Sequence, residues 1–366
     1  EFVAGFEREH VWSLLHQLQA ANDTESRALF AEAILRLGWP GEGQPAELAD
    51  GLRMIVAERH LDRGDARAAA DAVRDVHGIG SVLRLVTDRK FDPLVGDADR
   101  VARVRAAIET QDRLTAGALA AAPEDVDALV ERATYLRSVG RDRDVLDLLL
   151  PLMADPALVV ARGQRGFWLV NEAAFALIAT GAEDEGIELI RPLASMSLEE
   201  RPELINTSIN FTSLLLKTGR NEEALREVAR LAEAGADVVS DYGKMILWGN
   251  AACAAARLGR RGESDAWMRR MEAKVDENRP AMIATHLCRG EADAAERILI
   301  GALESDDWRD QAILWMQDWQ PRTDAPASLR AEAQFAELRA RPAVQAAFAR
   351  VGHRLRLPLP STLYGF

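Results

Sequence analysis

Six glycines recur along this chain, each directly after a run of residues with helical periodicity, and their spacing constrains the fold more than any other feature. They stand in the phrases LDRGDA, RSVGRD, IATGAE, LKTGRN, ARLGRR and LCRGEA. A glycine in this place favours the left-handed backbone conformation that commonly closes a helix. The last five are 31 to 41 residues apart, and the 76 residues between the first two amount to about two such intervals. We therefore expect elbows between paired helices at Gly64, Gly140, Gly181, Gly219, Gly259 and Gly290.

Other positions, counted from each glycine, repeat the same kind of side chain. Close crossing of two helices requires small residues, and these stand seven before the glycine (Ala57, Ala133, Ala174, Thr212, Ala252, with Ile283 the exception) and five after it (Ala69, Val145, Gly186, Ala224, Ser264, Ala295). Positions nine and twelve after the glycine form an apolar stripe at helical spacing, which predicts packing on the next hairpin. The pairs run from Val73 and Val76 to Leu299 and Ala302.

These columns resemble the tetratricopeptide repeat, which has small residues at the helix crossing, a glycine at the turn and a large apolar residue nine positions on. The interval of about 40 residues is longer than the 34 of the standard repeat, and the proline that closes its second helix is mostly missing. The resemblance implies an all-α fold: a right-handed α-solenoid of helical hairpins with capping helices at both ends. An irregular helical bundle is the alternative.

The frame divides the chain into four segments. Residues 1–44 are predicted to form an N-terminal helical cap, and residues 45–122 irregular first repeats that include a break near 88–99. Residues 123–305 carry the regular repeats. Residues 306–366 are expected to hold the C-terminal capping helices and a proline-rich, extended tail.

Three tryptophans near the end of the chain fall on one predicted helix. Trp308, Trp315 and Trp319 have the spacing of a single helical stripe. A solenoid needs a terminal unit that covers its last exposed core, so the stripe is expected to act as a cap. The alternative is an aromatic shelf for a ligand.

A second resemblance concerns the phrases VTDRKFDPL, GFWLVNEAAFAL and ARPAVQAAFARVGHRLRLPLPSTLYGF. They are similar to segments of a group of alphaproteobacterial tetratricopeptide proteins, many of which are exported. This resemblance implies a bacterial protein with a periplasmic rather than a cytoplasmic location. It carries over no catalytic residue.

The net charge and the short apolar runs argue against nucleic-acid binding and a membrane span, and the two cysteines raise the question of a disulfide. The formal net charge is −13, whereas proteins that bind nucleic acid through its phosphates need clustered Lys and Arg. No run approaches the roughly 18 apolar residues of a membrane span. Cys253 and Cys288 could form a disulfide only if their Cα atoms came within about 7 Å, so two buried free thiols are expected.

The chain shows no pattern typical of an enzyme. None of its six histidines forms the i, i+4 pair of a helical zinc site. Its glycine-rich phrases lack the Lys-Ser/Thr of a phosphate loop, and no Gly-x-Ser-x-Gly phrase is present. We therefore predict no catalytic residue, no metal site and no cofactor.

The first helix of each hairpin supplies the best candidate for a binding surface. In tetratricopeptide arrays this helix lines a concave groove, and its inward positions stand thirteen, ten, nine, six and three residues before the glycine. In this chain they mix amides, hydroxyls and large apolar groups, a composition that suits a bound peptide. The predicted partner-binding residues are Arg137, Trp168, Asn171, Phe175, Asn206, Ile209, Asn210, Ser213, Leu216 and Asn250. The alternative is that these amides are satisfied inside a tightly wound array.

Two functions fit these patterns. The first is a noncatalytic scaffold that holds a protein or peptide partner in the groove, with no role for nucleic acid and no membrane span. The second is a sensory or regulatory helical-repeat domain of a larger signalling protein or transcription regulator, by analogy of fold alone. The oligomeric state is left open by the sequence.

Overall fold

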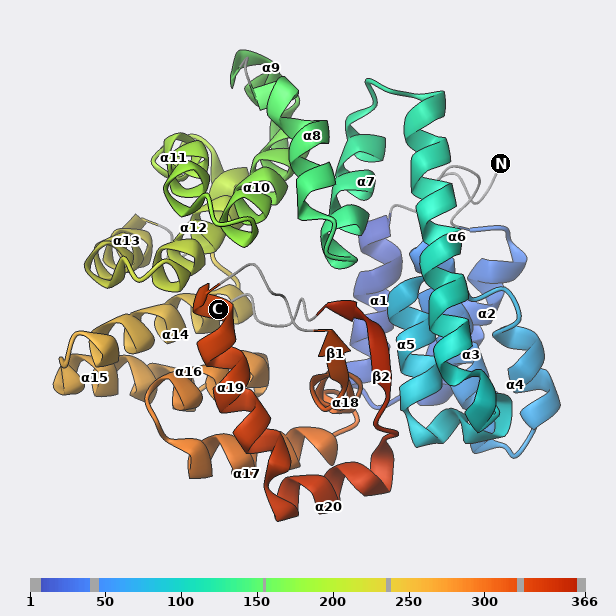
Figure 1. The fold of residues 1–366 in the computed structure, drawn as a ribbon. Coiled ribbons are helices and arrows are strands. Elements are labelled where there is room, and N and C mark those ends of the chain that lie inside the picture. The colour runs from blue at the N-terminus through green and yellow to red at the C-terminus, as the bar shows by residue number, and fades with distance from the viewer. Residues whose placement is uncertain (1–7, 40–45, 154–155, 235–237, 321–325, 361–366) are drawn as a thin grey trace. The chain divides into compact units, whose positions relative to one another are not determined.

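The computed structural model describes residues 8–39, 46–153, 156–234, 238–320 and 326–360. This part of the chain is almost entirely helical, which confirms the expected all-α class (Figure 1). It separates into two compact units, Glu1–Arg113 with Arg350–Pro358, and Leu114–Ala349 with Leu359–Phe366. Among the described helices, none has both the length and the apolar sequence that crossing a bilayer requires.

Unit 1 begins with two helical hairpins. A buried carboxylate binds the backbone of the segment that follows the second hairpin. Asp50 is fully buried and accepts hydrogen bonds from the backbone N–H groups of His77 (2.9 Å) and Gly78 (2.6 Å). It also pairs with Arg53 at 3.0 Å, so its charge is compensated. The elements of unit 1 are α1 (Arg8–Ala20), α2 (Thr24–Arg36), α3 (Ala46–Asp62), α4 (Ala66–Ala72), α5 (Ile79–Thr87), two 3₁₀ turns (Arg89–Leu94 and Asp97–Asp99) and the first part of α6 (Arg100–Ala121).

A segment from the end of the chain completes unit 1. Gly352 forms an antiparallel bridge with Asp88, and the N–H of His353 donates to the carbonyl of Thr87 at 2.7 Å. The His353 ring nitrogen Nε2 lies 2.6 Å from Asp92 Oδ1. Asp92 also accepts a hydrogen bond from buried Arg100 at 2.8 Å. The irregular stretch 88–99, where the repeat frame breaks, is therefore the stretch that receives the C-terminal segment.

Unit 2 contains the regular repeats and the terminal helices. After the last part of α6 come α7 (Val126–Ser138), α8 (Asp142–Met153), α9 (Pro156–Ala161), α10 (Gly163–Ala179), α11 (Glu183–Ala194), α12 (Ile205–Lys217), α13 (Asn221–Ala234), α14 (Asp241–Arg257), α15 (Arg261–Glu272), α16 (Arg279–Cys288), α17 (Ala292–Leu303), α18 (Arg309–Trp315), β1 (Asp318–Gln320), α19 (Pro326–Ala340) and α20 (Pro342–Val351). Strand β2 (Arg356–Pro360) begins in unit 1 and ends in unit 2.

Successive helices of unit 2 pair as hairpins, and each hairpin packs on the next. Helix α10 packs on α11, α12 on α13, α14 on α15 and α16 on α17. The first helices also touch in series, α10 with α12, α12 with α14, and α14 with α16. These pairs follow one another down the left of Figure 1.

The six predicted elbows are confirmed. All six glycines have φ between +74° and +90°, in the left-handed region. Each elbow carries the same pair of hydrogen bonds: at the third, the N–H of Gly181 donates to Ile178 O (3.2 Å) and that of Ala182 to Leu177 O (2.9 Å). This pattern satisfies carbonyls that a helix end would otherwise leave free.

The helix crossings also lie where the small residues predict. The Ser264 hydroxyl donates to the carbonyl of Ala252 at 2.8 Å, which joins the position five after one glycine to the position seven before it. A Cβ atom added at Gly186 would lie 2.8 Å from the carbonyl oxygen of Ala174, the equivalent pair of the third elbow. The apolar pairs nine and twelve after the glycine are buried as well, apart from half-buried Leu152.

The single helix expected from Trp308 to Trp319 is wrong. Helix α18 ends at Trp315, and Trp319 lies in strand β1. Trp315 is buried and meets Phe335 of α19 edge-on, with ring centroids 6.2 Å apart. The Trp319 indole N–H donates to the carbonyl of Leu314 at 2.9 Å. Both contacts join residues of the C-terminal part of unit 2. Residues 361–366 of the tail lie outside the described chain.

Candidate partner-binding surface

The ten residues predicted to bind a partner lie on α7, α10, α12 and α14, and the structure divides them in two. Arg137, Trp168, Phe175 and Asn210 are half-buried, and Asn206 is exposed. The others are at most 6% exposed, which corrects the expectation that all ten line an open groove. The buried residues are Asn171, Ile209, Ser213, Leu216 and Asn250.

Asn171 is satisfied by its own chain. Its side-chain nitrogen donates to the carbonyl of Phe167 (2.8 Å) and to the hydroxyl of Thr207 (3.0 Å). Its side-chain oxygen accepts from the amide of Asn210 at 3.1 Å. The residue therefore joins α10 to α12 and is a core amide, as the alternative interpretation held.

Asn250 makes the equivalent link between the next two helices. Its side-chain nitrogen donates to the hydroxyls of Thr212 (2.8 Å) and Ser213 (2.9 Å) across the interface of α12 and α14. Because the Asn250 side-chain nitrogen and these two hydroxyls are bonded to one another, they avoid the penalty of about 1–3 kcal/mol for an unsatisfied buried group. The amides of the first helices thus specify how neighbouring hairpins pack.

The position ten before the glycine explains this result. Its members Val130, Asn171, Ile209 and Gly249 are all buried. At Gly249 the neighbouring helix comes so close that an added Cβ would lie 2.7 Å from Thr285 Oγ1. This side of each first helix therefore faces the adjacent first helix and not a groove.

The position thirteen before the glycine stays accessible along the array. Asp127 and Asn206 are exposed, and Trp168 and Ile246 are half-buried. Tyr242, one helical turn before Ile246 on α14, is 49% exposed. The repeat frame did not select Tyr242, although an aromatic residue in the first turn of an inner helix is a visible signal. These side chains form what we call the inner-end row: Asp127, Trp168, Asn206, Tyr242 and Ile246.

Arg137 and Phe175 form a cation–π contact beside the inner-end row. The Arg137 guanidinium pairs with the buried carboxylate of Glu172 and lies over the Phe175 ring, 5.0 Å from its centroid. Thr134 donates a further hydrogen bond of 3.4 Å to the same carboxylate. Arg137 is therefore held in place by Glu172, and its charge is already compensated.

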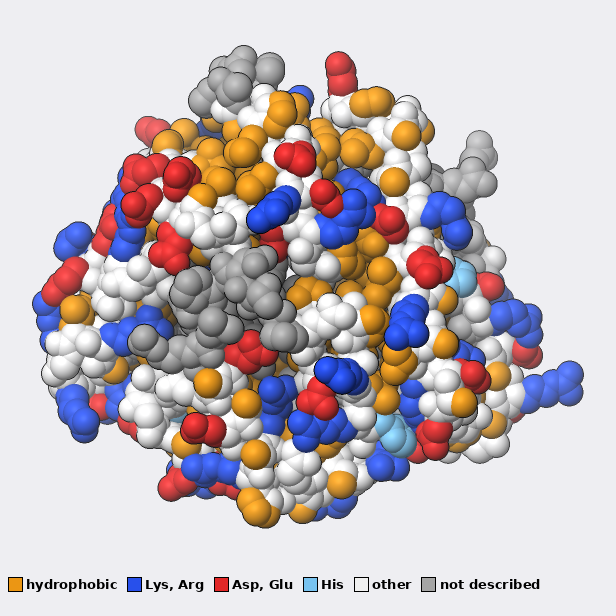
Figure 2. Space-filling view, viewed as in Figure 1, with side chains coloured by type: hydrophobic (Ala, Val, Ile, Leu, Met, Phe, Trp, Pro, Cys, Tyr) orange, Lys and Arg blue, Asp and Glu red, His pale blue; other side chains and the backbone are white. Residues whose placement is uncertain are grey.

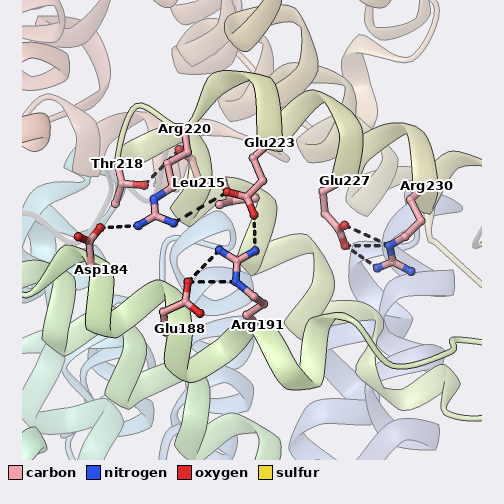
Figure 3. A network of polar contacts seen from close by, with 9 residues as sticks. All are labelled: Asp184, Glu188, Arg191, Leu215, Thr218, Arg220, Glu223, Glu227 and Arg230. Carbon is pink, nitrogen blue, oxygen red and sulfur yellow. Dashed lines mark hydrogen bonds and ion pairs between the residues drawn. The ribbon is translucent and has the colours of Figure 1, made fainter.

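The second helices present a different, strongly paired surface. In Figure 3, Arg191 of α11 bonds to Glu188 and to Glu223 of α13, and Arg220 reaches back to Asp184. Hydrogen bonding to Glu223 is the main reason that the pKa of Arg191 is raised. Charged side chains also dot the left side of the face in Figure 2, over α11 to α15. Three of these ion pairs join neighbouring hairpins: Arg191 with Glu223, Arg220 with Asp184, and Arg260 with Glu222.

Side chains that could ligate a metal ion do not cluster among the described residues. Within those ranges, no group of three or more His, Cys, Asp or Glu side chains could hold a metal ion. Cys253 and Cys288 are both free thiols, the first buried and the second partly exposed.

Comparison with known proteins adds no assignment. No protein-family model matches the chain, and a search of curated proteins finds no match. These comparisons therefore assign no role to the inner-end row.

Proposed function

We propose that this protein is a noncatalytic scaffold that binds an extended segment of another protein along the inner-end row. The proposal includes the arrangement of unit 2 as a tetratricopeptide-like, right-handed α-solenoid. The observation that carries it is the contrast between two columns of the same helices. The position ten before each glycine is buried, whereas the position thirteen before it remains accessible on four successive first helices.

The chemistry of the row suits a peptide. The Trp168 and Tyr242 rings and the Ile246 side chain offer apolar surface for side chains of the partner, and aromatic residues dominate the binding energy of many interfaces. Asn206 offers an amide that can both donate to and accept from a peptide backbone. Because the row crosses α10, α12 and α14, an extended segment would meet one such residue per hairpin.

The paired outer surface supports the choice of the inner ends. Arg191 on α11 and Arg220, directly before α13, are engaged by carboxylates of the neighbouring hairpin. A partner that bound there would have to displace these ion pairs or leave them buried, which costs free energy. The inner-end row requires no such displacement at Trp168, Asn206 or Tyr242.

The test is peptide selection with the full chain. Peptides selected from a displayed random library would be measured by calorimetry against the wild type, the Trp168→Ala/Asn206→Ala variant and a matched double variant on α13, Arg226→Ala/Glu233→Ala. We expect the inner-end variant to lose at least roughly tenfold in affinity, about 1.4 kcal/mol, with little change in melting temperature. Equal affinity for all three proteins would refute the proposal.

A further inference from the structure

The two cysteines of the chain meet at the interface of neighbouring hairpins. Gly249 of α14 touches Thr285 of α16, with an added Cβ only 2.7 Å from the threonine hydroxyl. One turn further along these helices come Cys253, four residues after Gly249, and Cys288, three residues after Thr285. Cys288 packs against the apolar cluster that contains Cys253, so both thiols lie at this interface.

The two thiols have unequal surroundings. Cys253 is 5% exposed, whereas Cys288 is partly exposed as the last residue of α16, where solvent can reach it. Arg257, one turn after Cys253, lies beside Cys288 and donates to the carbonyl of Leu216 at 2.6 Å. A second cation is Arg289, which pairs with Asp265 and Glu291 at 2.6 and 2.7 Å. Both cations act on the two thiols, and Arg257 in addition lies within hydrogen-bonding reach of Cys288, the more accessible of the two.

This asymmetry separates the ionisation of the two thiols. Burial raises the pKa of Cys253 well above its usual range. Hydrogen bonding from Cys253, opposed by partial burial and assisted by Arg257 and Arg289, lowers the pKa of Cys288 to about 7. The negative end of the α16 dipole disfavours a thiolate at Cys288, and the two arginines offset this effect. Near neutral pH a large fraction of Cys288 is thiolate, the reactive form, beside a protonated thiol.

We propose that Cys288 and Cys253 form an oxidant-sensitive dithiol in which a peroxide oxidises Cys288 and Cys253 then closes a disulfide between α14 and α16. In the first step the Cys288 thiolate attacks one peroxide oxygen, the O–O bond breaks, and the products are a sulfenic acid and hydroxide. In the second step the Cys253 sulfur attacks the sulfenic sulfur and the S–O bond breaks. The Cys253 proton and the hydroxyl group leave as water. Overall, two thiols and one hydrogen peroxide yield one disulfide and two waters.

The disulfide would fasten two neighbouring hairpins of unit 2 to each other. The bond closes a loop of about 35 residues in the unfolded chain, which disfavours unfolding. We therefore expect the oxidised protein to melt roughly 5–10 °C above the reduced protein. This property concerns α14 and α16 and does not require a partner at the inner-end row.

The first experiment uses the full reduced chain and a few equivalents of hydrogen peroxide near neutral pH. We expect intact-mass spectrometry to show the loss of two hydrogens, and peptide mapping to find Cys253 linked to Cys288. A dithiol reductant should restore the original mass. Two free thiols after treatment would overturn the proposal, and so would a sulfinic acid on Cys288 with Cys253 still reduced, or a disulfide between two chains.

Variants then separate the two roles. In Cys253→Ala, Cys288 should stop at the sulfenic acid and be trapped by a dimedone probe, whereas Cys288→Ser should leave Cys253 unreactive. Arg257→Gln should slow sulfenic acid formation roughly threefold or more at neutral pH, and Arg257→Lys, which keeps the charge, should slow it less. If the first variant fails to fold, the wild-type mapping still decides the matter. Equal rates for the wild type and Arg257→Gln would contradict the assigned role of that cation.

Discussion

At the scale of single residues, the repeat frame assigns each side chain a place by its distance from a glycine. The Ser264 hydroxyl bonds to Ala252 O, and Gly186 lies against Ala174 O, so the same two columns meet at different elbows. The requirement is steric, because backbone oxygen of the first helix fills the space that a larger side chain on the second would need. This contact can be tested directly at Gly186.

Gly186→Ala should destabilise unit 2. The new Cβ would lie 2.8 Å from Ala174 O and from Ile178 Cγ1, and the backbone atom cannot move without shifting its helix. We expect a loss of about 1–3 kcal/mol in the free energy of unfolding, measured by urea denaturation. The control is Gly262→Ala in α15, where nothing lies within 4 Å of the added Cβ. Helix propensity makes that change neutral or stabilising by up to about 1 kcal/mol. Similar effects of the two changes would contradict the close crossing.

Two asparagines predicted to line the same groove should behave in opposite ways. Asn171→Ala removes three hydrogen bonds and leaves the buried Thr207 hydroxyl without its amide donor, so we expect a loss of about 2–3 kcal/mol. Asn206→Ala changes an exposed side chain and should stay within about 0.5 kcal/mol of the wild type. Chemical denaturation of both variants decides this, and equal stabilities would mean that the amide network contributes nothing.

At the scale of elements, local sequence predicts helices and elbows well and tertiary packing poorly. The elbows follow from glycine, which can adopt the required φ wherever the rest of the chain lies. The end of α18 has no such local cause. Trp308, Trp315 and Trp319 keep helical spacing, yet the helix stops at Trp315, with buried Gln317 following it. There Arg339 of α19 donates to the carbonyl of Gln317 at 2.6 Å, a contact that spacing within one segment cannot reveal.

The stability of the junction between the 3₁₀ turn at 89–94 and the C-terminal segment should depend on pH. Burial raises the pKa of Asp92, but hydrogen bonds from His353 and Arg100 outweigh it and lower the pKa overall. A lowered carboxylate pKa adds stability above the unfolded value of about 3.9, and that stability is lost as the pH falls through the folded value. Asp92→Asn should therefore lower stability by about 1 kcal/mol at neutral pH, a figure reduced for solvent screening. The deficit should begin to shrink at about pH 4 and disappear only when the pH falls below the lowered pKa of folded Asp92.

Melting curves of the wild type and Asp92→Asn between about pH 2 and pH 7 would measure this deficit. The control is Asp75→Asn, an exposed carboxylate of the same unit, which should run parallel to the wild type. A deficit for Asp92→Asn that stays constant across the range would show that the carboxylate charge plays no part.

At the scale of the whole molecule, the candidate surface shows that positions counted along one helix do not predict which of its faces is buried. Residues ten and thirteen before the glycine differ by about 60° around a helix, so both can be drawn facing inward. Which one is covered depends on the side where α10, α12 and α14 touch, and this is set by the packing of entire hairpins. Asn171 and Trp168 therefore have different roles: the amide of Asn171 belongs to the core, and the indole of Trp168 remains available to a partner.

The last prediction concerns the joining of the two ends of the chain in unit 1. A chain that stops after Val351 lacks both the Gly352 bridge to Asp88 and the His353 bond to Thr87 O. A chain that stops after Pro358 keeps them and loses only residues assigned to unit 2. Hydrogen exchange of residues 86–95 should rise roughly tenfold or more in the first chain and stay at the wild-type rate in the second.

Both truncations should change unit 2 in the same way, which supplies an internal check. Pro360 packs against the elbow of α7 and α8, where an added Cβ at Gly140 would lie 2.9 Å from its ring. Both chains lack this proline, so both should exchange faster around residues 136–141. If residues 86–95 exchange equally fast in both chains, the segment 352–358 does not stabilise unit 1. A difference between the two chains confined to 86–95 would show instead that the C-terminal segment is a structural part of the N-terminal unit, because residues 352–358, by which the two chains differ, supply the contacts of Gly352 and His353 with Asp88 and Thr87.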